Sequence, residues 1–154
     1  MATTIILVRH GQTEWNRVER FRGRADVPLN DVGLQQAEAT GCRIADQWHP
    51  VVLYSSPLSR AVKTAEAIGR HVNLPVKKYP GLVDIDYGDW QGLTPEEARS
   101  RWPEIVDAWY NTPQLACIPG GEMLDELRTR TMRVVNDLTT RHTGQSIVLV
   151  GHTV

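Results

Sequence analysis

An arginine and a histidine stand side by side directly after an apolar run near the start of this chain. Residues 5–8 (Ile-Ile-Leu-Val) precede Arg9, His10 and Gly11. Four apolar residues ended by glycine are typical of a buried strand in a parallel sheet. A guanidinium beside an imidazole, at a glycine that lets the backbone come close, suits a phosphate dianion. The pattern therefore predicts a phosphate site, although an isolated Arg-His-Gly is usually a surface arginine and a turn histidine.

A second apolar run ends in the same way near the end of the chain. Residues 146–150 (Ser-Ile-Val-Leu-Val) precede Gly151, His152 and Thr153. Open α/β sheets bind their ligands at the carboxyl ends of the strands. If the two strands are neighbours in the sheet, His10 and His152 lie close together at that edge.

Arg60 is a third candidate for the same edge. It falls in the first turn of a helix expected after Pro57, and that helix follows another apolar strand at residues 51–54. A cation at a helix N-terminus opposes the helix dipole. Its presence is easier to explain if an anion also binds there, because the free N–H groups of such a terminus accept phosphate. A solvated surface arginine is the alternative.

Acidic residues gather among apolar ones in residues 82–92, where aspartates occupy positions 84, 86 and 89. Carboxylates in such surroundings indicate a functional group rather than a plain loop. The alternative is that Asp84 and Asp86 cap turns. Three tryptophans follow, at positions 90, 102 and 109, and core packing is favoured for them over the wall of a substrate pocket.

The elements that must position these residues alternate between strand and helix. A helix is expected to open at Asn30 or Asp31 and to end at Pro50. Its expected apolar face is Leu34, Ala37, Gly41, Ile44 and Trp48. The last long helix follows Glu122, and its arginines are expected on the solvated face: Arg128, Arg130 and Arg133. The pattern predicts an α/β three-layer sandwich with a mostly parallel central sheet flanked by helices.

Composition excludes several classes of function. The 154 residues suit one domain, and 41% hydrophobic with 23% charged residues is ordinary for a globular protein. A net charge of −1 offers no basic field for nucleic acid and no attraction to an anionic membrane. Neither a signal peptide nor a membrane span is recognisable, so the cytoplasm is the expected compartment. No cluster with metal-ligand spacing is present, and no metal or other cofactor is expected.

The chain resembles the histidine phosphatase superfamily, the phosphoglycerate mutase-like enzymes. The resemblance begins with Arg-His-Gly-Gln-Thr-Glu-Trp-Asn at residues 9–16. Further matching blocks follow in order: Phe-Arg-Gly-Arg at 21–24, Ser-Ser-Pro-Leu-Ser-Arg at 55–60, Pro-Gly-Gly-Glu at 119–122 and Gly-His at 151–152. It extends from Ile5 to Thr153 and implies the phosphoglycerate mutase-like fold.

The resemblance implies phosphoryl transfer through a covalent phosphohistidine on His10. Arg9, Arg60 and His152 would stabilise the charge on the phosphate oxygens, which lets cations replace the usual magnesium. Asp84 would protonate the departing alkoxide, although the family has a glutamate at this position, and Asp86 is the fallback. Residues implied in binding the substrate are Gly11, Asn16, Arg22, Gly23 and Thr153.

The favoured activity is metal-independent hydrolysis of a small phosphorylated metabolite. A cofactor-dependent phosphoglycerate mutase is the first alternative, but those enzymes carry a longer insertion than residues 93–118 of this chain. A non-catalytic phosphate-binding remnant is the second.

Family members continue beyond the second histidine with a helix and further sheet, whereas this chain stops at Val154. We therefore expect a single domain over residues 1–154 that lacks its C-terminal part. It would expose an apolar patch near Leu149 and Val154, and such patches favour association into homo-oligomers.

Overall fold

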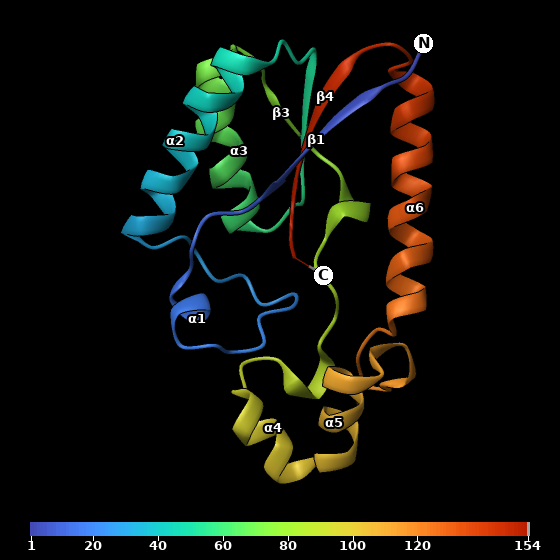
Figure 1. Ribbon diagram of the computed structural model, residues 1–154. Helices are drawn as coiled ribbons and strands as arrows, with labels where there is room; N and C mark the ends of the chain where they lie inside the picture. Colours follow the sequence, from blue (N-terminus) through green and yellow to red (C-terminus); the bar gives the residue numbers. More distant parts are fainter. Residues whose placement is uncertain (154) are drawn as a thin grey trace.

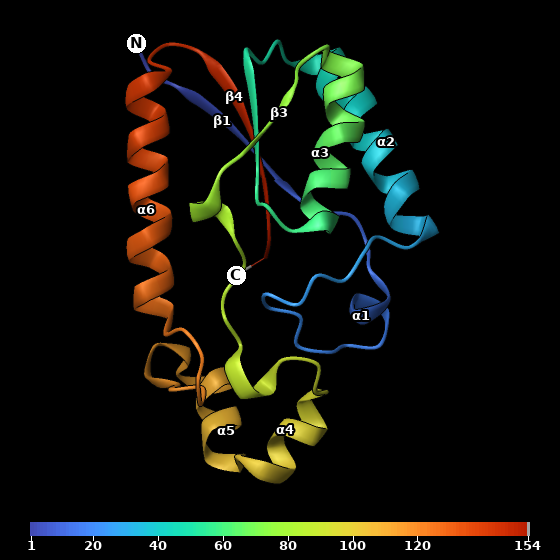
Figure 2. The same ribbon diagram turned by 180° about the vertical axis from the view of Figure 1, so that it is seen from behind.

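A four-stranded parallel sheet forms the centre of the computed structural model, which describes residues 1–153. Its strands are β1 (Thr4–Arg9), β2 (Val52–Ser55), β3 (Val76–Lys78) and β4 (Ser146–Gly151), in the order β1-β4-β2-β3. Helices α2 (Asp31–Gln47) and α3 (Ser59–Val72) lie on one side of the sheet, and α6 (Leu124–Arg141) lies on the other (Figures 1 and 2). The expected three-layer α/β fold is confirmed.

The side chains of β4 alternate between the two helical layers. Val148 and Val150 pack in the cluster that contains Ala61 and Ile68 of α3. Ile147 and Leu149 point the opposite way, into the cluster formed with Val134 and Leu138 of α6. Alternation with a period of two is the geometry of a strand. Because both faces are covered, the strand needs a continuous apolar run rather than an alternating one.

A third core lies beyond the carboxyl ends of β1 and β4, where Figure 1 shows α4 (Pro95–Arg101) and α5 (Pro103–Asn111). Its buried members are Phe21, Ile85, Tyr87, Trp90, Ala98, Val106, Ile118 and Leu127. Trp90 is fully buried, and Trp102 and Trp109 pack against the same cluster. The expectation that the three tryptophans form core is confirmed. Short 3₁₀ turns lie at Pro80–Leu82, Gly88–Trp90 and Pro113–Leu115.

Helix α2 begins where the sequence predicts and packs through smaller residues than expected. The Asn30 side chain caps it by accepting a hydrogen bond from the Gly33 N–H. The buried residues of the helix are Gly33, Ala37, Gly41 and Ile44. Leu34 is 46% exposed, so it was wrongly placed on the buried face, whereas Trp48, the C-cap residue, packs against the core cluster that contains Ile44. The close approach of α3 explains this, because a side chain at Gly41 would meet Ala67 and His71.

Strand β1 lies at the edge of the sheet and is less buried than its apolar sequence predicts. Leu7 is 76% exposed, because α6 does not cover this end of β1. Leu149, expected in an exposed patch, is buried against α6 instead. Val154 lies outside the described residues. The exposed apolar residue on this flank is therefore Leu7.

The short helix α1 (Glu14–Arg17) follows β1 directly, and the backbone between them touches the start of α2. A Cβ atom at Gly33 would overlap the Gln12 carbonyl oxygen, and one at Gly11 would overlap the Gly33 carbonyl oxygen. This contact fixes how the residues after β1 leave the sheet, and it requires glycine on both sides.

Gly33→Ala is therefore expected to lower the free energy of unfolding by about 1–3 kcal/mol, the usual cost of overpacking. Gly151→Ala is the matched control, since a Cβ atom there would meet nothing within 4 Å. Urea denaturation measures both variants. Equal stability of the two variants would contradict the contact.

Candidate active site

The register of β1 against β4 brings the two candidate histidines together. Arg9 pairs with Gly151, so the next residue of each strand is a histidine. The His10 N–H donates to the Gly151 carbonyl at 3.1 Å. The imidazole centroids of His10 and His152 lie 5.2 Å apart. The expected convergence of the two histidines at the carboxyl edge of the sheet is confirmed.

One nitrogen of His10 is held by the backbone and the other is left to react. Nδ1 lies 2.6 Å from the Gly11 carbonyl oxygen. A carbonyl oxygen can only accept, so Nδ1 carries the proton and the Nε2 lone pair is free. The pKa of His10 is lowered to about 4, chiefly by burial and also by the charges of the three arginines Arg60, Arg22 and Arg9, while the hydrogen bond to Gly11 opposes this shift. At neutral pH His10 is thus a neutral imidazole.

Arg60 is fully buried and donates hydrogen bonds to three groups. It is therefore not the solvated surface arginine that was the alternative. Its Nη1 donates to the Ala25 carbonyl at 2.7 Å, and its Nη2 donates to the Gly23 carbonyl at 2.7 Å and to Asp84 Oδ2 at 3.1 Å. Its Nε is buried without a partner among the described residues. That N–H is available to an anion.

Asp84, rather than Asp86, is the aspartate that lies in the site. Asp84 Oδ1 accepts from the Ile85 N–H at 2.9 Å, and its Oδ2 lies 3.4 Å from His152 Nδ1. Burial raises the pKa of this carboxyl, while Arg60 and the Ile85 N–H lower it. Asp86 instead accepts from the Gly88 N–H at 2.9 Å and pairs with Arg24 at 3.3 Å, so it stabilises a turn.

Ser56 orients His152, and the sequence did not single out this serine. The Ser56 hydroxyl lies 2.8 Å from His152 Nε2, and Ser56 is fully buried. The pKa of His152 is lowered to about 2, chiefly by burial and also by the charges of Arg60 and His10. The ring is therefore neutral at neutral pH, whereas the resemblance implies a charge-stabilising role for it. A bound phosphate dianion would favour the protonated ring.

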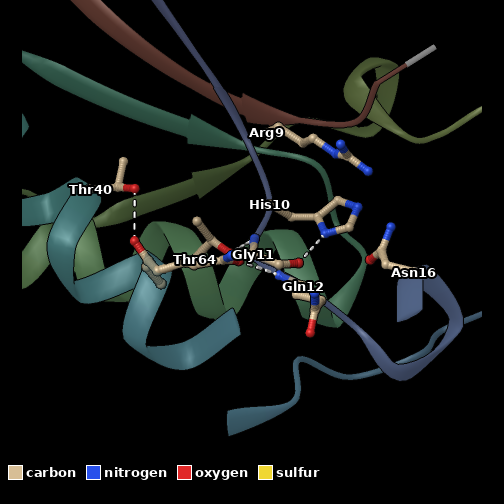
Figure 3. Close-up of a pocket in the computed structure, with 9 residues that line it drawn as sticks. Arg9, His10, Gly11, Gln12, Asn16, Thr40 and Thr64 are labelled. Atoms are coloured by element: carbon tan, nitrogen blue, oxygen red, sulfur yellow. Dashed lines mark hydrogen bonds between the residues drawn. The ribbon is translucent and has the colours of Figure 1, made fainter. Parts of the chain in front are cut away.

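Asn16 and two arginines complete the polar wall of the site. Asn16 Oδ1 accepts from the Thr13 N–H at 2.9 Å and from its hydroxyl at 2.8 Å, which leaves Nδ2 as a free donor. Figure 3 shows Arg9, His10 and Asn16 around one space. Arg9 is exposed and forms no ion pair with a described residue, and Arg22 Nε is buried without a partner among them.

Two hollows open onto this wall. One of about 400 Å³ includes Arg9, His10, Gly11 and Asn16 in its lining and extends toward α2. The other, of about 470 Å³, shares Arg9 and Asn16 and adds Arg22, Tyr87 and Tyr110. The second hollow therefore extends from the arginines toward aromatic groups.

Three further expected binding residues have structural surroundings of their own. The Gly11 N–H donates to the Thr64 hydroxyl at 3.0 Å, so it is already paired. Gly23 is buried at φ +50°, where a side chain would be strained against Tyr87 and Ile85, and its carbonyl accepts from Arg60. Thr153 is exposed. A direct contact with substrate stays a prediction for Gly11, Gly23 and Thr153.

Arg130 does not lie on the solvated face of α6, where the sequence predicted it. It is half-buried and bonds to Glu122 and to backbone carbonyls on both sides of Leu82, including that of Asp84. The side of α6 that looks polar in the sequence meets the loop that carries Asp84. The sequence does not distinguish Arg130 from the exposed arginines Arg128 and Arg133 of the same helix.

Residues 1–153 contain neither a metal-binding cluster of side chains nor a membrane-spanning helix. No group of three or more His, Cys, Asp or Glu side chains is placed to hold a metal ion within this range. No helix among these residues is long and apolar enough to cross a membrane.

Paired histidines, convergent arginines and a buried carboxyl at the carboxyl edge of a parallel sheet define an α/β protein that handles phosphate groups. The family model described as histidine phosphatase superfamily (branch 1) matches residues 5–154. The chain belongs to this superfamily.

Curated relatives and solved structures agree with the family. The chain is 37% identical over 150 residues to phosphoserine phosphatase 1 of Hydrogenobacter thermophilus, covering 97% of this chain and 71% of that protein. It is 38% identical over 152 residues to the metal-independent phosphoserine phosphatase of Arabidopsis thaliana, covering 97% of this chain and 64% of that protein. The structure of Bacillus stearothermophilus YhfR matches with a TM-score of 0.92 and 33% identity, covering 98% and 74% of the two chains.

A mycobacterial glucosyl-3-phosphoglycerate phosphatase complexed with VO3 matches with a TM-score of 0.86 and 31% identity, covering 95% of this chain and 74% of the other. The expected class, a phosphomonoester hydrolase of the histidine phosphatase superfamily, is confirmed. These matches do not fix the substrate.

Removing the guanidinium of Arg60 should destabilise the protein strongly. Arg60→Met leaves Asp84 buried without its cation, which typically costs roughly 3–5 kcal/mol. Arg24→Met is the control, since the Arg24 side chain is 43% exposed and its ion pairs should contribute about 1 kcal/mol or less. Urea denaturation of both variants tests this, and a loss for Arg60→Met no greater than for Arg24→Met would refute it.

The neutral histidines should make the protein sensitive to acid. An unfolded histidine has a pKa of about 6.5. The folded values are about 4 for His10 and about 2 for His152. Below about pH 6.5 the unfolded chain therefore binds more protons, and the free energy of unfolding falls as the pH falls. Asp84 acts in the opposite direction, because its raised pKa lets the folded protein take up that proton first.

His152→Gln should consequently reduce the stability lost between about pH 7.5 and pH 5 by roughly 2 kcal/mol. His49→Gln is the control, because His49 is exposed. Denaturation across this pH range measures the difference. A wild-type pH dependence in His152→Gln would show that the ring is not held neutral.

Proposed function

We propose that this chain hydrolyses phosphate monoesters of small metabolites through a phosphohistidine on His10. One observation carries the proposal: His10 Nδ1 donates to the Gly11 carbonyl at 2.6 Å, which leaves Nε2 unprotonated beside the arginines. A neutral imidazole with a fixed tautomer is a competent nucleophile. Membership of the superfamily supports the same chemistry.

The cations of the site supply the charge stabilisation. Phosphoryl transfer depends mainly on positioning and on stabilising the negative charge of the phosphate oxygens. The charges of Arg9, Arg22 and Arg60 act on His10, and Arg22 and Arg60 each keep a buried Nε without a partner among the described residues. Asn16 Nδ2 adds a neutral donor. Arginines keep their charge throughout the reaction, so the stabilisation needs no proton movement.

Asp84 is the proposed proton donor. In the first step the Nε2–P bond forms, the P–O bond to the alcohol breaks, and the Asp84 proton passes to the departing alkoxide. In the second step water attacks phosphorus, its proton passes to the Asp84 carboxylate, and the Nε2–P bond breaks. The pKa of Asp84, raised by burial, favours the protonated form that the first step requires.

The names of the relatives suggest where to look for the substrate. They name phosphatases of phosphoserine and of glucosyl-3-phosphoglycerate. Small phosphorylated hydroxy and amino acids therefore head the panel of candidates. A mutase would return the phosphoryl group to another hydroxyl, so the assay should measure isomer as well as free phosphate.

A cytoplasmic location and self-association also belong to this proposal. Support for association comes from the exposed Leu7 on edge strand β1, which borders a hollow of about 460 Å³ shared with Leu82, Val135 and Leu149. Unpaired strand edges and exposed apolar surface both favour contact with another chain.

His10→Ala should abolish phosphoenzyme formation from labelled p-nitrophenyl phosphate, because it removes the attacking nitrogen. His49→Ala, a change at an exposed histidine, is the matched control and should label like the wild type. Labelling is read after an alkaline quench, since phosphohistidine is lost in acid. Undiminished labelling of His10→Ala would overturn the proposal.

A further inference from the structure

Arg130 uses every donor of its guanidinium on the loop that carries Asp84 and on one carboxylate. Nη1 donates to the carbonyls of Gly81 at 3.0 Å and Val83 at 2.8 Å. Nη2 donates to the Asp84 carbonyl at 3.0 Å and to Glu122 Oε2 at 2.9 Å, and Nε donates to Glu122 Oε1 at 2.6 Å. A guanidinium has five N–H donors, and all five are satisfied in this way.

The loop held by Arg130 has no regular structure of its own. It runs from the 3₁₀ turn at Pro80–Leu82 to the next turn at Gly88–Trp90, without a strand or helix between them. Backbone carbonyls in such a segment need partners from elsewhere. The side chain of Arg130 supplies them for residues immediately before Asp84 and for Asp84 itself.

Glu122 fixes Arg130 and also contacts the chain beyond Asp84. Its backbone N–H donates to the Asp86 carbonyl at 2.8 Å, and its Oε2 accepts from the Asp86 N–H at 3.3 Å. The Glu122 side chain is only 10% exposed, so its ion pair with Arg130 is well shielded from water. Together Arg130 and Glu122 hold the backbone on both sides of Asp84.

Two guanidiniums therefore hold the two ends of one residue. Arg60 binds the Asp84 carboxylate, and Arg130 binds the Asp84 carbonyl. Arg60 alone would leave the backbone of Asp84 free to shift relative to His10. The charge of Arg130 also reaches the site, since it is among those that lower the pKa of His152.

We propose that Arg130, held by Glu122, is a positioning residue that sets the place of Asp84 relative to the leaving oxygen of the substrate. This inference rests on the proposed function, in which Asp84 is the proton donor. A displacement of about 1 Å in such a group can cost about 100-fold in rate.

The test compares two phosphoryl donors in single-turnover phosphorylation of His10. The alkoxide of glycerol 2-phosphate needs a proton as it leaves, whereas the phenolate of p-nitrophenyl phosphate does not. Arg130→Met is expected to slow phosphorylation by glycerol 2-phosphate by about 100-fold and to change phosphorylation by p-nitrophenyl phosphate little. Arg133→Met, at an exposed arginine of the same helix, is the matched control and should behave like the wild type.

Two further variants keep the test valid if Arg130→Met fails to fold. Arg130→Lys keeps the charge but loses the fork of donors, and Glu122→Gln weakens the hold on Arg130. Both should show the same preference for the donor with the better leaving group. Wild-type kinetics in Arg130→Lys would show that charge, and not position, is what Arg130 supplies, and would overturn the inference.

Asp84→Asn separates this inference from the proposed function. A donor-selective loss in Asp84→Asn together with an equal loss for both donors in the folded Arg130 and Glu122 variants overturns the positioning role alone. An equal loss for both donors in Asp84→Asn itself overturns the acid role, and the positioning inference falls with it.

Discussion

The buried guanidinium of Arg60 is the interaction on which the site depends. A charge taken fully out of water is tolerated only when its partners replace the lost hydration. Those partners are the Gly23 and Ala25 carbonyls and the Asp84 carboxylate, which come from two different loops. Arg60 belongs to α3, which packs against the sheet whose strands β1 and β4 lead into the two histidines. Arg60 therefore connects both loops to the sheet. The placement of these two loops at the site therefore follows from the hydrogen bonds that the buried Arg60 guanidinium requires.

The pairing of β1 with β4 supplies the second constraint, and it acts on the histidines. A shift of one residue in that pairing would turn every side chain of a strand to the opposite face. Such a shift would exchange the side chains that pack toward α3 with those that pack toward α6, and the close packing of both cores disfavours it. The packing of the two cores thus sets the strand register, and the register places the two imidazoles 5.2 Å apart.

The sequence could predict what local patterns encode, and the missed features are contacts between distant segments. Apolar runs located β1, β2 and β4, the cap at Asn30 located α2, and the two strand endings placed His10 and His152 at one edge. The exposure of Leu7 depends on how much of the sheet α6 covers, and the hydrophobic periodicity of the sequence does not encode that extent. Arg130 and Ser56 were missed because their partners lie 46 or more positions away in the chain. The site roles of individual residues rest on the resemblance and stay predictions until variants are measured.

The basic residues of the site are of two kinds: arginines that are always charged, and histidines whose charge depends on their surroundings. The arginines are charged at any pH the fold experiences. Both histidines are held neutral, chiefly by burial and then by the same arginines. The neutral state has a different consequence for each ring. In the proposed reaction His10 uses its free lone pair to attack phosphorus, whereas a neutral His152 avoids a further buried positive charge beside Arg60. A phosphate dianion beside this ring would offset the repulsion from Arg60 and would favour protonation of His152.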